Sequence, residues 1–332
     1  MMRAWLLPAI LLLAACGPGP GEAETRHRFM AMGTLVDVTL YGVPAAEAEA
    51  AAREGEALFH ALHREWQPYG DGALGQLNHA LGTVPGTVPG TVPTDLATLI
   101  AEAERLAEAT GGLFDPRLGT LVKLWGFGSD ETMPAAPPPP DAIAAWLAAR
   151  PVQYDLGGFA KGVAVDRAIE LLQARGIEHA IVNAGGDLRA IGRKGERRWR
   201  IGIRAPRDAG KVMAALEAGD DESVFTSGDY ERWFEFEGRR YHHILDPRTG
   251  YPTEGLASVT VLHTDAALAD AAATALAVAG PEDWPATAAA LGLEAVMVVH
   301  TDGRIELTPA MQPRVWFTSE AFGGQATVRS LP

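Results

Sequence analysis

The pattern of apolar and polar positions is clearest in residues 154–187, and the rest of the chain is organised around this stretch. It predicts a short strand, a glycine turn, a helix, a second strand at 180–182 and a second glycine turn at 183–187. Apolar residues repeat at helical spacing through the middle of the stretch, which predicts one buried helix face. These residues are Val163, Val165, Ala168, Ile169 and Leu172.

The first glycine turn has the layout of an anion site. Gly157 and Gly158 allow a sharp turn and a close approach to a ligand, and Lys161 follows where the helix begins. The N–H groups of a helix start attract anions, and an ammonium group adds to that attraction. The segment lacks both the GxGxxG spacing and the GKS/T of a P-loop. A plain connection is equally compatible with the turn alone; Lys161 and the second glycine turn favour the anion site.

The same patterns predict further elements on both sides of this stretch. They alternate irregularly and include hairpin-like pairs, which favours an α+β fold of mixed sheets over a doubly wound parallel sheet. The expected helices are 45–63, 95–109, 141–149 and 265–279. The expected strand regions are 28–41, 199–206, 223–236, 257–263, a strand that runs into a proline-glycine loop over 240–252, and a hairpin at 295–307. The tandem repeat at 82–93 is typical of a tolerated surface loop.

The N-terminus indicates export. Arg3 precedes an apolar run that is too short to span a bilayer, and Leu-Ala-Ala-Cys ends at Cys16. This end resembles a bacterial lipoprotein signal (1–16), with Cys16 as the lipidated residue and 17–27 as a flexible tether. An ordinary cleaved signal is the alternative. Because Cys16 is the only cysteine of the chain, we favour the lipoprotein, anchored in the periplasm to the inner or outer membrane.

Charge narrows the class of ligand. The net charge is −14 and the pI is about 5.1, which argues against a general nucleic-acid binder. An acidic protein that binds an anion needs local help from glycine turns, Lys, Arg or a divalent cation.

Two helical positions offer oxygen ligands to such a cation. Asp270 and Thr274 lie four residues apart, so both side chains leave the same helix face, among residues that are nearly all alanine. A carboxylate and a hydroxyl suit a hard cation such as Mg²⁺. From the residues alone, a pairing of Asp270 with an arginine and a back-bond from Thr274 to its own helix are favoured.

A histidine pair offers a base near neutral pH. His242 and His243 precede Asp246, and in a strand their side chains point to opposite faces. No third histidine stands at metal-ligand spacing, which disfavours zinc. A hydrogen-bonded structural role for the pair is equally compatible with the residues. Trp66 and Tyr69 could stack on a flat ring, although a core role for Trp66 fits as well.

Eight motifs occur in one order along the chain. They are MGT (32–34), Asn78, GGLFDP (111–116), DLGGFAKG with VAVD (155–166), NAGGD (183–187), TSGDYER (226–232), HHILDPRTGYP (242–252) and AD-AAAT (269–274). This ordered set resembles the ApbE family, the bacterial FAD:protein FMN transferases. The likeness covers essentially the whole segment 28–332, which we expect to be one flavin transferase domain.

The resemblance implies a two-lobed, T-fold-related architecture of mixed sheets and flanking helices, with FAD in a crevice between the lobes. It implies Mg²⁺ on the Asp270 carboxylate, the Thr274 hydroxyl and the carbonyl of Ala160. It implies catalytic roles for His243 and Asp270, with His242 as the alternative histidine. The residues that it places along FAD are Met32, Tyr69, Asn78, Asp115, Lys161, Asp166, Gly185, Gly186, Asp187, Thr226, Ser227 and Gly228.

The resemblance also implies the reaction. FMN would be joined through a phosphoester to a Ser or Thr of an acceptor protein, and AMP would leave. The acceptors would be subunits of sodium-pumping quinone reductases or related electron-transfer complexes. The alternatives are an FAD pyrophosphatase, which uses water as the acceptor, and a periplasmic FAD-binding lipoprotein without chemistry.

Overall fold

The computed structural model describes residues 24–83, 92–128, 134–208 and 210–332. The expected signal peptide, Cys16 and repeat positions 84–91 lie outside these ranges. The expected tether extended to residue 27, and this boundary is wrong, because strand β1 (Glu24–Ala31) begins at Glu24. Glu24 pairs with Tyr41 on the neighbouring strand, so residues 24–27 are held by a ladder of strand pairs.

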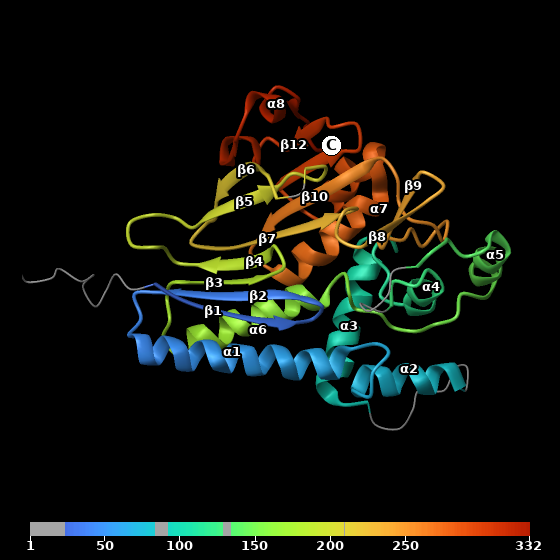
Figure 1. Ribbon diagram of the computed structural model, residues 1–332, viewed down its shortest axis with the longest axis horizontal. Helices are drawn as coiled ribbons and strands as arrows, with labels where there is room; N and C mark the ends of the chain where they lie inside the picture. The colour runs from blue at the N-terminus through green and yellow to red at the C-terminus, as the bar shows by residue number, and fades with distance from the viewer. Residues whose placement is uncertain (1–23, 84–91, 129–133, 209) are drawn as a thin grey trace, which may run out of the picture.

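The largest sheet has nine strands and runs through the middle of the molecule (Figure 1). Its neighbouring strands are antiparallel except for the last pair. This confirms mixed α+β layers in place of a doubly wound parallel sheet. In spatial order the strands are β1, β2 (Thr34–Tyr41), β3 (Ala180–Ala184), β4 (Asp187–Ile191), β7 (Asp221–Gly228), β10 (Leu256–His263), β11 (Ala295–His300), β12 (Ile305–Leu307) and β14 (Ala326–Val328).

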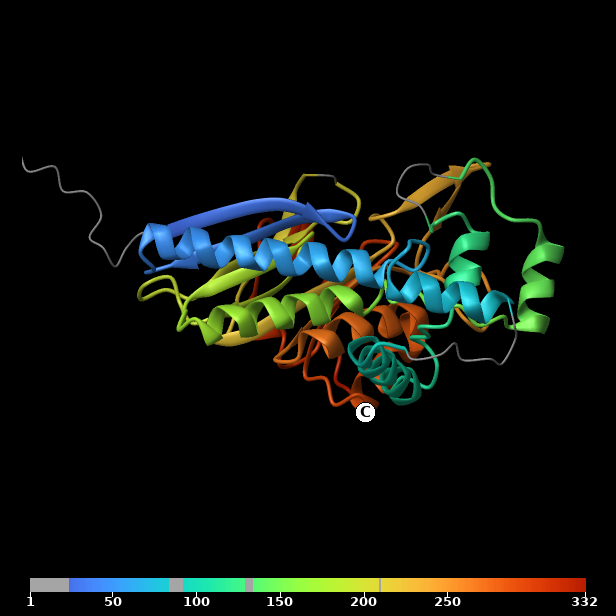
Figure 2. The same cartoon turned by 90° about the horizontal axis from the view of Figure 1, so that it is seen from below.

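Helices cover one face of this sheet, as the view from below shows (Figure 2). Phe225, Val259 and Val296 point toward them and share one apolar core with their buried faces. Helix α7 (Ala266–Ala290) contains a break, because Gly280 has a φ of 82° and Pro281 follows it. The covering helices are α1 (Ala45–Trp66), α3 (Thr94–Ala109), α6 (Ala160–Ala174) and α7 (Ala266–Ala290).

A small sheet covers the opposite face. Neighbouring strand residues alternate between the two cores, so Val224 and Met297 pack with the small sheet while Phe225 and Val296 pack with the helices. Trp199 and Met213 also belong to this second core. The elements on this side are β5 (Arg200–Arg204), β6 (Val212–Glu217), β13 (Val315–Phe317), the short 3₁₀ helix η1 (Gln312–Arg314) and α8 (Glu320–Gly323).

A smaller lobe has a core of its own around Trp125, which donates its indole N–H to the carbonyl of Gly250 at 2.8 Å. Phe127, Trp146 and Phe234 pack in the same cluster. The elements of the smaller lobe are α4 (Gly119–Leu124), α5 (Pro140–Ala149), β8 (Trp233–Phe236) and β9 (Arg239–His242).

Helix α2 (Ala73–Thr83), which the sequence pattern did not predict, packs against α1.

The central stretch is partly as expected. Helix α6 begins at Ala160, one residue before Lys161, and the turn at 185–186 joins β3 to β4 as a tight hairpin. The expected short strand before the first glycine turn is absent, because residues 154–156 make loop contacts instead; the N–H of Asp155 donates to the carbonyl of Pro116 at 2.8 Å. Within the described ranges, no helix has the length and apolar character needed to cross a bilayer.

Candidate active site

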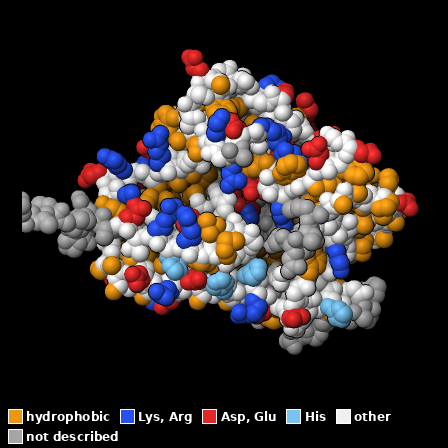
Figure 3. All heavy atoms as spheres, viewed as in Figure 1, with side chains coloured by type: hydrophobic (Ala, Val, Ile, Leu, Met, Phe, Trp, Pro, Cys, Tyr) orange, Lys and Arg blue, Asp and Glu red, His pale blue; other side chains and the backbone are white. Residues whose placement is uncertain are grey.

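A cavity of about 470 Å³ lies between the nine-stranded sheet and the smaller lobe. In the space-filling view, a hollow with acidic and basic side chains opens near the centre of the molecule (Figure 3). Leu118, Val122 and Phe127 form the wall on the side of the smaller lobe. On the other side, α6, α7 and the ends of β4 and β7 contribute charged and hydroxyl side chains. The volume is within the usual range for a small-molecule site.

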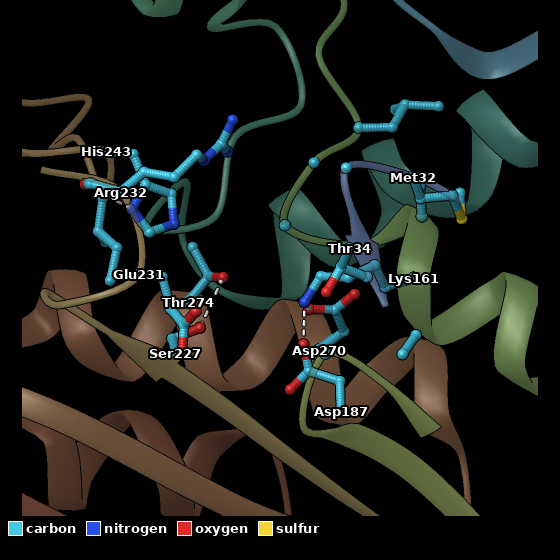
Figure 4. Close-up of a pocket in the computed structure, with 18 of the residues that line it drawn as sticks. Met32, Thr34, Lys161, Asp187, Ser227, Glu231, Arg232, His243, Asp270 and Thr274 are labelled. Atoms are coloured by element: carbon cyan, nitrogen blue, oxygen red, sulfur yellow. Dashed lines mark hydrogen bonds and ion pairs between the residues drawn. The ribbon is translucent and has the colours of Figure 1, made fainter. Parts of the chain in front are cut away.

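Lys161, Asp187 and Asp270 meet at one side of the cavity (Figure 4). The ammonium of Lys161 forms a salt bridge with Asp187, and its Nζ lies 4.0 Å from Oδ1 of Asp270. Backbone donors hold both carboxylates: the N–H of Thr226 donates to Asp187 at 2.9 Å, and that of Gly162 to Asp270 at 3.0 Å. One cation therefore faces two fixed carboxylates.

Burial raises the pKa of the Asp270 carboxyl, and the nearby ammonium of Lys161 and the N–H of Gly162 partly oppose that rise. A buried carboxylate is costly without a cation beside it. The Asp270 side chain is 6% exposed, and Lys161 already interacts with Asp187. The site therefore favours a further positive charge next to Asp270.

Further oxygen atoms that could bind a cation lie near Asp270 on the same helix face. Thr274 lies one turn further on, and its hydroxyl is 3.2 Å from the hydroxyl of Ser227 on β7. A Cβ at Gly158 would lie 3.0 Å from the Thr274 hydroxyl, so glycine keeps this space open. Ala160, the first residue of α6, also lines the cavity. In the described ranges, no group of three or more His, Cys, Asp or Glu side chains forms a metal cluster. The donors that do gather are oxygens, which suit a hard cation.

The two histidines occupy different surroundings. His243 lines the cavity, and its Nδ1 lies 3.3 Å from the carbonyl oxygen of Arg232. A carbonyl can only accept, so this contact keeps the proton of the neutral ring on Nδ1 and leaves Nε2 as the acceptor. His242 is buried outside the cavity lining, with its Nε2 2.9 Å from the carbonyl oxygen of Thr253. Strand β9 ends at His242, and of the two histidines only His243, the next residue, lines the cavity.

Burial lowers the pKa of His242, and it lowers the pKa of His243 well below the ordinary 6.5, with Arg232 acting in the same direction. The unfolded chain then binds more protons than the folded one below about pH 6.5, so stability falls as the pH is lowered. We expect the free energy of unfolding, measured with urea from pH 7.5 to 5.5, to decline by up to about 1.4 kcal/mol per pH unit for each histidine. The free energy of unfolding of His243→Gln should decline less steeply with falling pH than that of the wild type. An unchanged slope would show that burial of His243 is not the cause.

The glycine hairpin and the β1–β2 turn form another wall. Gly185 has a φ of 74°, and a Cβ there would lie 2.3 Å from the hydroxyl of Thr34, so only glycine fits. Gly186 donates its N–H to the side chain of Asn183 at 2.8 Å. Met32 also has a positive φ, 51°, and its N–H donates to Nδ1 of His63 at 3.0 Å. Hydrogen bonding and close packing thus fix the backbone at this wall.

Tyr69 and Asp115 reach the cavity from the opposite side. The Tyr69 hydroxyl donates to the carbonyl of Gly119 at 2.9 Å and lies 3.2 Å from Asp155. Burial, with Asp155 nearby, raises the pKa of this hydroxyl, so it stays protonated as a donor. Asp115 is held by Arg117 through both its backbone and side-chain N–H groups.

Most of the expected site residues line this one cavity. Those that do are Met32, Tyr69, Asp115, Ala160, Lys161, Gly185, Gly186, Asp187, Thr226, Ser227, Gly228, His243, Asp270 and Thr274.

Two residues expected to contact FAD, Asn78 and Asp166, are not among the residues that line the cavity. Asp166 accepts from Arg189 at 2.6 Å and from the N–H of Ala266 at 3.1 Å, which ties α6 to β4 and to the start of α7. The Asn78 amide bridges backbone groups behind the cavity wall. Its Nδ2 donates to the carbonyls of Pro68 and Tyr154 at 3.0 and 2.8 Å, and its Oδ1 accepts from the N–H of Tyr154 at 2.7 Å.

Asn78 therefore has a structural role that can be measured. We expect Asn78→Ala to lower the free energy of unfolding by about 2–4 kcal/mol, because three partly buried backbone groups lose their partner. Urea unfolding gives this value. Gln76→Ala on the same helix is the control: its exposed amide contacts only the carbonyl of Asp71, so the loss should stay below about 1 kcal/mol. Equal losses in the two variants would contradict the bridging role.

The sequence did not single out four residues that line the cavity. Tyr230, Glu231 and Arg232 follow β7, and Arg204 ends β5. Arg204 donates to Glu231 at 3.0 Å, which joins the small sheet to the loop after β7. Burial, with Glu231 nearby, raises the pKa of Tyr230 to about 12. Tyr230, Glu231 and Arg232 lie inside the motif TSGDYER, which could have indicated them from the sequence. Arg204 lies in no such motif.

Comparisons with known proteins extend over the same residues. The profile of the ApbE family matches residues 32–297. A FAD:protein FMN transferase of Rhodobacter capsulatus is 40% identical over 95% of this chain, which spans 62% of that relative's length. One of Treponema pallidum is 36% identical, with 82% of this chain and 85% of the relative covered.

Solved structures agree with the fold. The ApbE protein of Thermotoga maritima superposes with a TM-score of 0.77 at 31% identity, covering 88% of this chain and 99% of that one. The flavin transferase ApbE of Vibrio cholerae superposes with a TM-score of 0.75 at 29% identity, with the same shares covered.

Proposed function

The chain belongs to the ApbE family, and we propose that it is a Mg²⁺-dependent FAD:protein FMN transferase that joins FMN to a Ser or Thr hydroxyl of an acceptor protein. The observation that carries this proposal is the cluster at the cavity wall, where Lys161 and the oxygens of Asp270 and Thr274 face one space. A pyrophosphate needs positive charge in an acidic protein, and this cluster supplies one cation and a ligand set for another.

The donor set fits Mg²⁺. Asp270 supplies a buried carboxylate and Thr274 a hydroxyl on the same helix face, and Ala160 lies across from them at the start of α6. When bound there, Mg²⁺ would neutralise charge on the pyrophosphate and favour displacement at phosphorus. Asp270 and Thr274 would hold this ion, with the Ala160 carbonyl as a third oxygen.

The residues of the chain then have distinct tasks in the transfer. Lys161 binds the pyrophosphate beside the start of α6. Nε2 of His243 accepts the proton of the acceptor hydroxyl while that oxygen forms a bond to the phosphorus of the FMN half. The bond from this phosphorus to the bridging oxygen breaks, and AMP leaves with the bonding electrons. Fixed hydrogen bonds in the walls keep these groups oriented at no cost during reaction.

Release of AMP separates this proposal from simple flavin binding. The chain from Gly17, which retains every described residue, would be incubated with FAD and Mg²⁺, and AMP would be measured with and without an acceptor peptide. We expect AMP release that depends on the peptide and on Mg²⁺. Equal AMP release without peptide would instead indicate a pyrophosphatase, and tight FAD binding without any AMP would indicate a carrier.

The partner and the location are proposals of the same kind. The name of the relatives implies an acceptor protein. We propose that the acceptors are subunits of sodium-pumping quinone reductases or related electron-transfer complexes.

The export signal and Cys16 support a periplasmic protein held to a membrane by lipid on Cys16. Labelling of cells with a radioactive fatty acid tests this: label should enter the wild type and be absent from Cys16→Ser.

A further inference from the structure

A basic segment lies outside the cavity and outside all eight motifs. Residues 193–200, RKGERRWR, contain five Lys or Arg in a chain whose net charge is −14. This segment connects β4 to β5, and a turn with Gly195 at a φ of 63° folds it back on itself. Trp199 is 5% exposed and donates its indole N–H to the carbonyl of Ile191 at 3.0 Å. The buried Trp199 therefore fixes the segment, while the arginines on either side of it stay exposed.

The segment lies beside the start of β1. Lys194 forms a salt bridge with Glu24, the first described residue, and Arg26 lines the same shallow hollow. In Figure 1, the connection from β4 to β5 and the N-terminal end of β1 lie at the same end of the molecule, away from α5. Basic side chains are visible in this part of the space-filling view (Figure 3). We name the exposed surface of Arg26 and residues 193–200 the basic end.

Three cations of the basic end form no salt bridge with a carboxylate of the described residues. Arg193 pairs with Asp220 at 2.9 Å and Arg26 with Asp37 at 3.3 Å. No such pair holds Arg197, Arg198 or Arg200, although the charge of Arg198 helps to lower the pKa of Asp220. The acidic side chains that line the same hollow are Glu24, Glu196 and Glu217, and six basic side chains outnumber them. Guanidinium groups that are not held in a salt bridge bind phosphate oxygens well, because each can donate two parallel hydrogen bonds.

Chain length places this surface near the expected anchor. Seven residues lie between Cys16 and Glu24, so the two are eight Cα–Cα steps apart, and an extended chain of that length spans at most about 29 Å. A lipid on Cys16 would thus keep the basic end within reach of the headgroups. We propose that the basic end docks on the anionic phospholipid surface of the membrane, so that the enzyme lies on the bilayer in one orientation. The anchor belongs to the proposed location, whereas the charge of the basic end does not depend on it.

This contact would set where the cavity faces. The basic end is at one extremity of the long axis, and the cavity lies near the centre (Figures 1 and 3). Docking through the end would leave the cavity mouth open to the side, where an acceptor in the same membrane can reach it. The attraction is electrostatic, so it acts within about a Debye length of the surface and weakens with salt.

The test uses the chain from Gly17, which carries no lipid, with vesicles of phosphatidylcholine alone or with 30–40% phosphatidylglycerol (about this fraction gives a strongly anionic surface). Sedimentation measures the bound fraction at low and high salt. We expect binding to the anionic vesicles only, lost at high salt. Arg197→Glu with Arg198→Glu should lower the partition coefficient about 10-fold or more.

The matched control is Arg105→Glu with Lys123→Glu, which makes the same change in net charge at exposed positions away from the basic end. It should bind within about 2-fold of the wild type, and circular dichroism checks that both variants are folded. Equal losses in the two variants, or equal binding to neutral vesicles, would overturn the proposal. So would release by free glycerol phosphate at constant ionic strength, which would indicate a site for single phosphates. AMP release should be unchanged in both variants, so this result is independent of the transferase proposal.

Discussion

Replacing Asp270 by asparagine is expected to lower FMN transfer by roughly 10²–10³-fold. The variant removes the buried negative charge that would hold the cation, while its amide oxygen can still accept from the N–H of Gly162. Turnover of FAD and acceptor peptide across a range of Mg²⁺ concentrations measures the loss. We expect the affinity for FAD to increase with Mg²⁺ in the wild type and to be indifferent to Mg²⁺ in the variant.

Asp302→Asn is the control for this change. Asp302 is an exposed carboxylate that pairs with Arg304 on the turn between β11 and β12, far from the cavity lining. Its variant should keep activity within about 2-fold of the wild type. Full Mg²⁺-dependent activity of Asp270→Asn would contradict the assignment of the metal to Asp270. If its free energy of unfolding fell by several kcal/mol, the loss of activity would instead be due to unfolding of the variant.

Replacing His243 by alanine is expected to lower transfer by about 10²–10⁴-fold, because the acceptor hydroxyl loses its base. FAD affinity should change little, since the proposed pyrophosphate site is at Lys161 and Asp270. Added imidazole should restore part of the rate in this variant, as a small base can enter the space that the ring leaves. Rates with and without imidazole, at saturating FAD, measure both effects.

His242→Gln is the matched control, because His242 is the neighbouring residue but bonds to Thr253 outside the cavity lining. We expect reduced stability and nearly normal turnover at saturating substrate. The opposite result, loss of transfer in His242→Gln and activity in His243→Ala, would assign the base to His242.

Local rules were enough to predict much of the site. Helical periodicity placed Asp270 and Thr274 on one face, and both line the cavity. The sequence also predicted that only one of His242 and His243 faces a given site, and only His243 reaches the cavity, although it lies just after the end of β9. The helical prediction succeeds because side-chain direction follows directly from helix geometry.

The features that the sequence did not reveal come from contacts between distant segments. Asp166 lies five residues after Lys161, which turns it roughly 140° around α6 and toward Arg189 on β4. Asn78 lies on a helix that the pattern did not indicate, and it bonds to Tyr154, 76 positions away. Strand β6 is rich in alanine, so its sequence carried little strand signal, although the small sheet stabilises it. Such partners depend on tertiary packing, which periodicity does not contain.

Intact mass of an acceptor peptide tests the central claim most directly. The chain from Gly17 would be incubated with FAD, Mg²⁺ and a peptide that carries the acceptor sequence Asp…Ser/Thr-Gly-Ala/Ser-Thr. Transfer predicts a peptide heavier by one FMN less one water, in the presence of Mg²⁺ and wild-type protein but not with Asp270→Asn. An unmodified peptide together with free FMN and AMP, or with no AMP at all, would contradict the account.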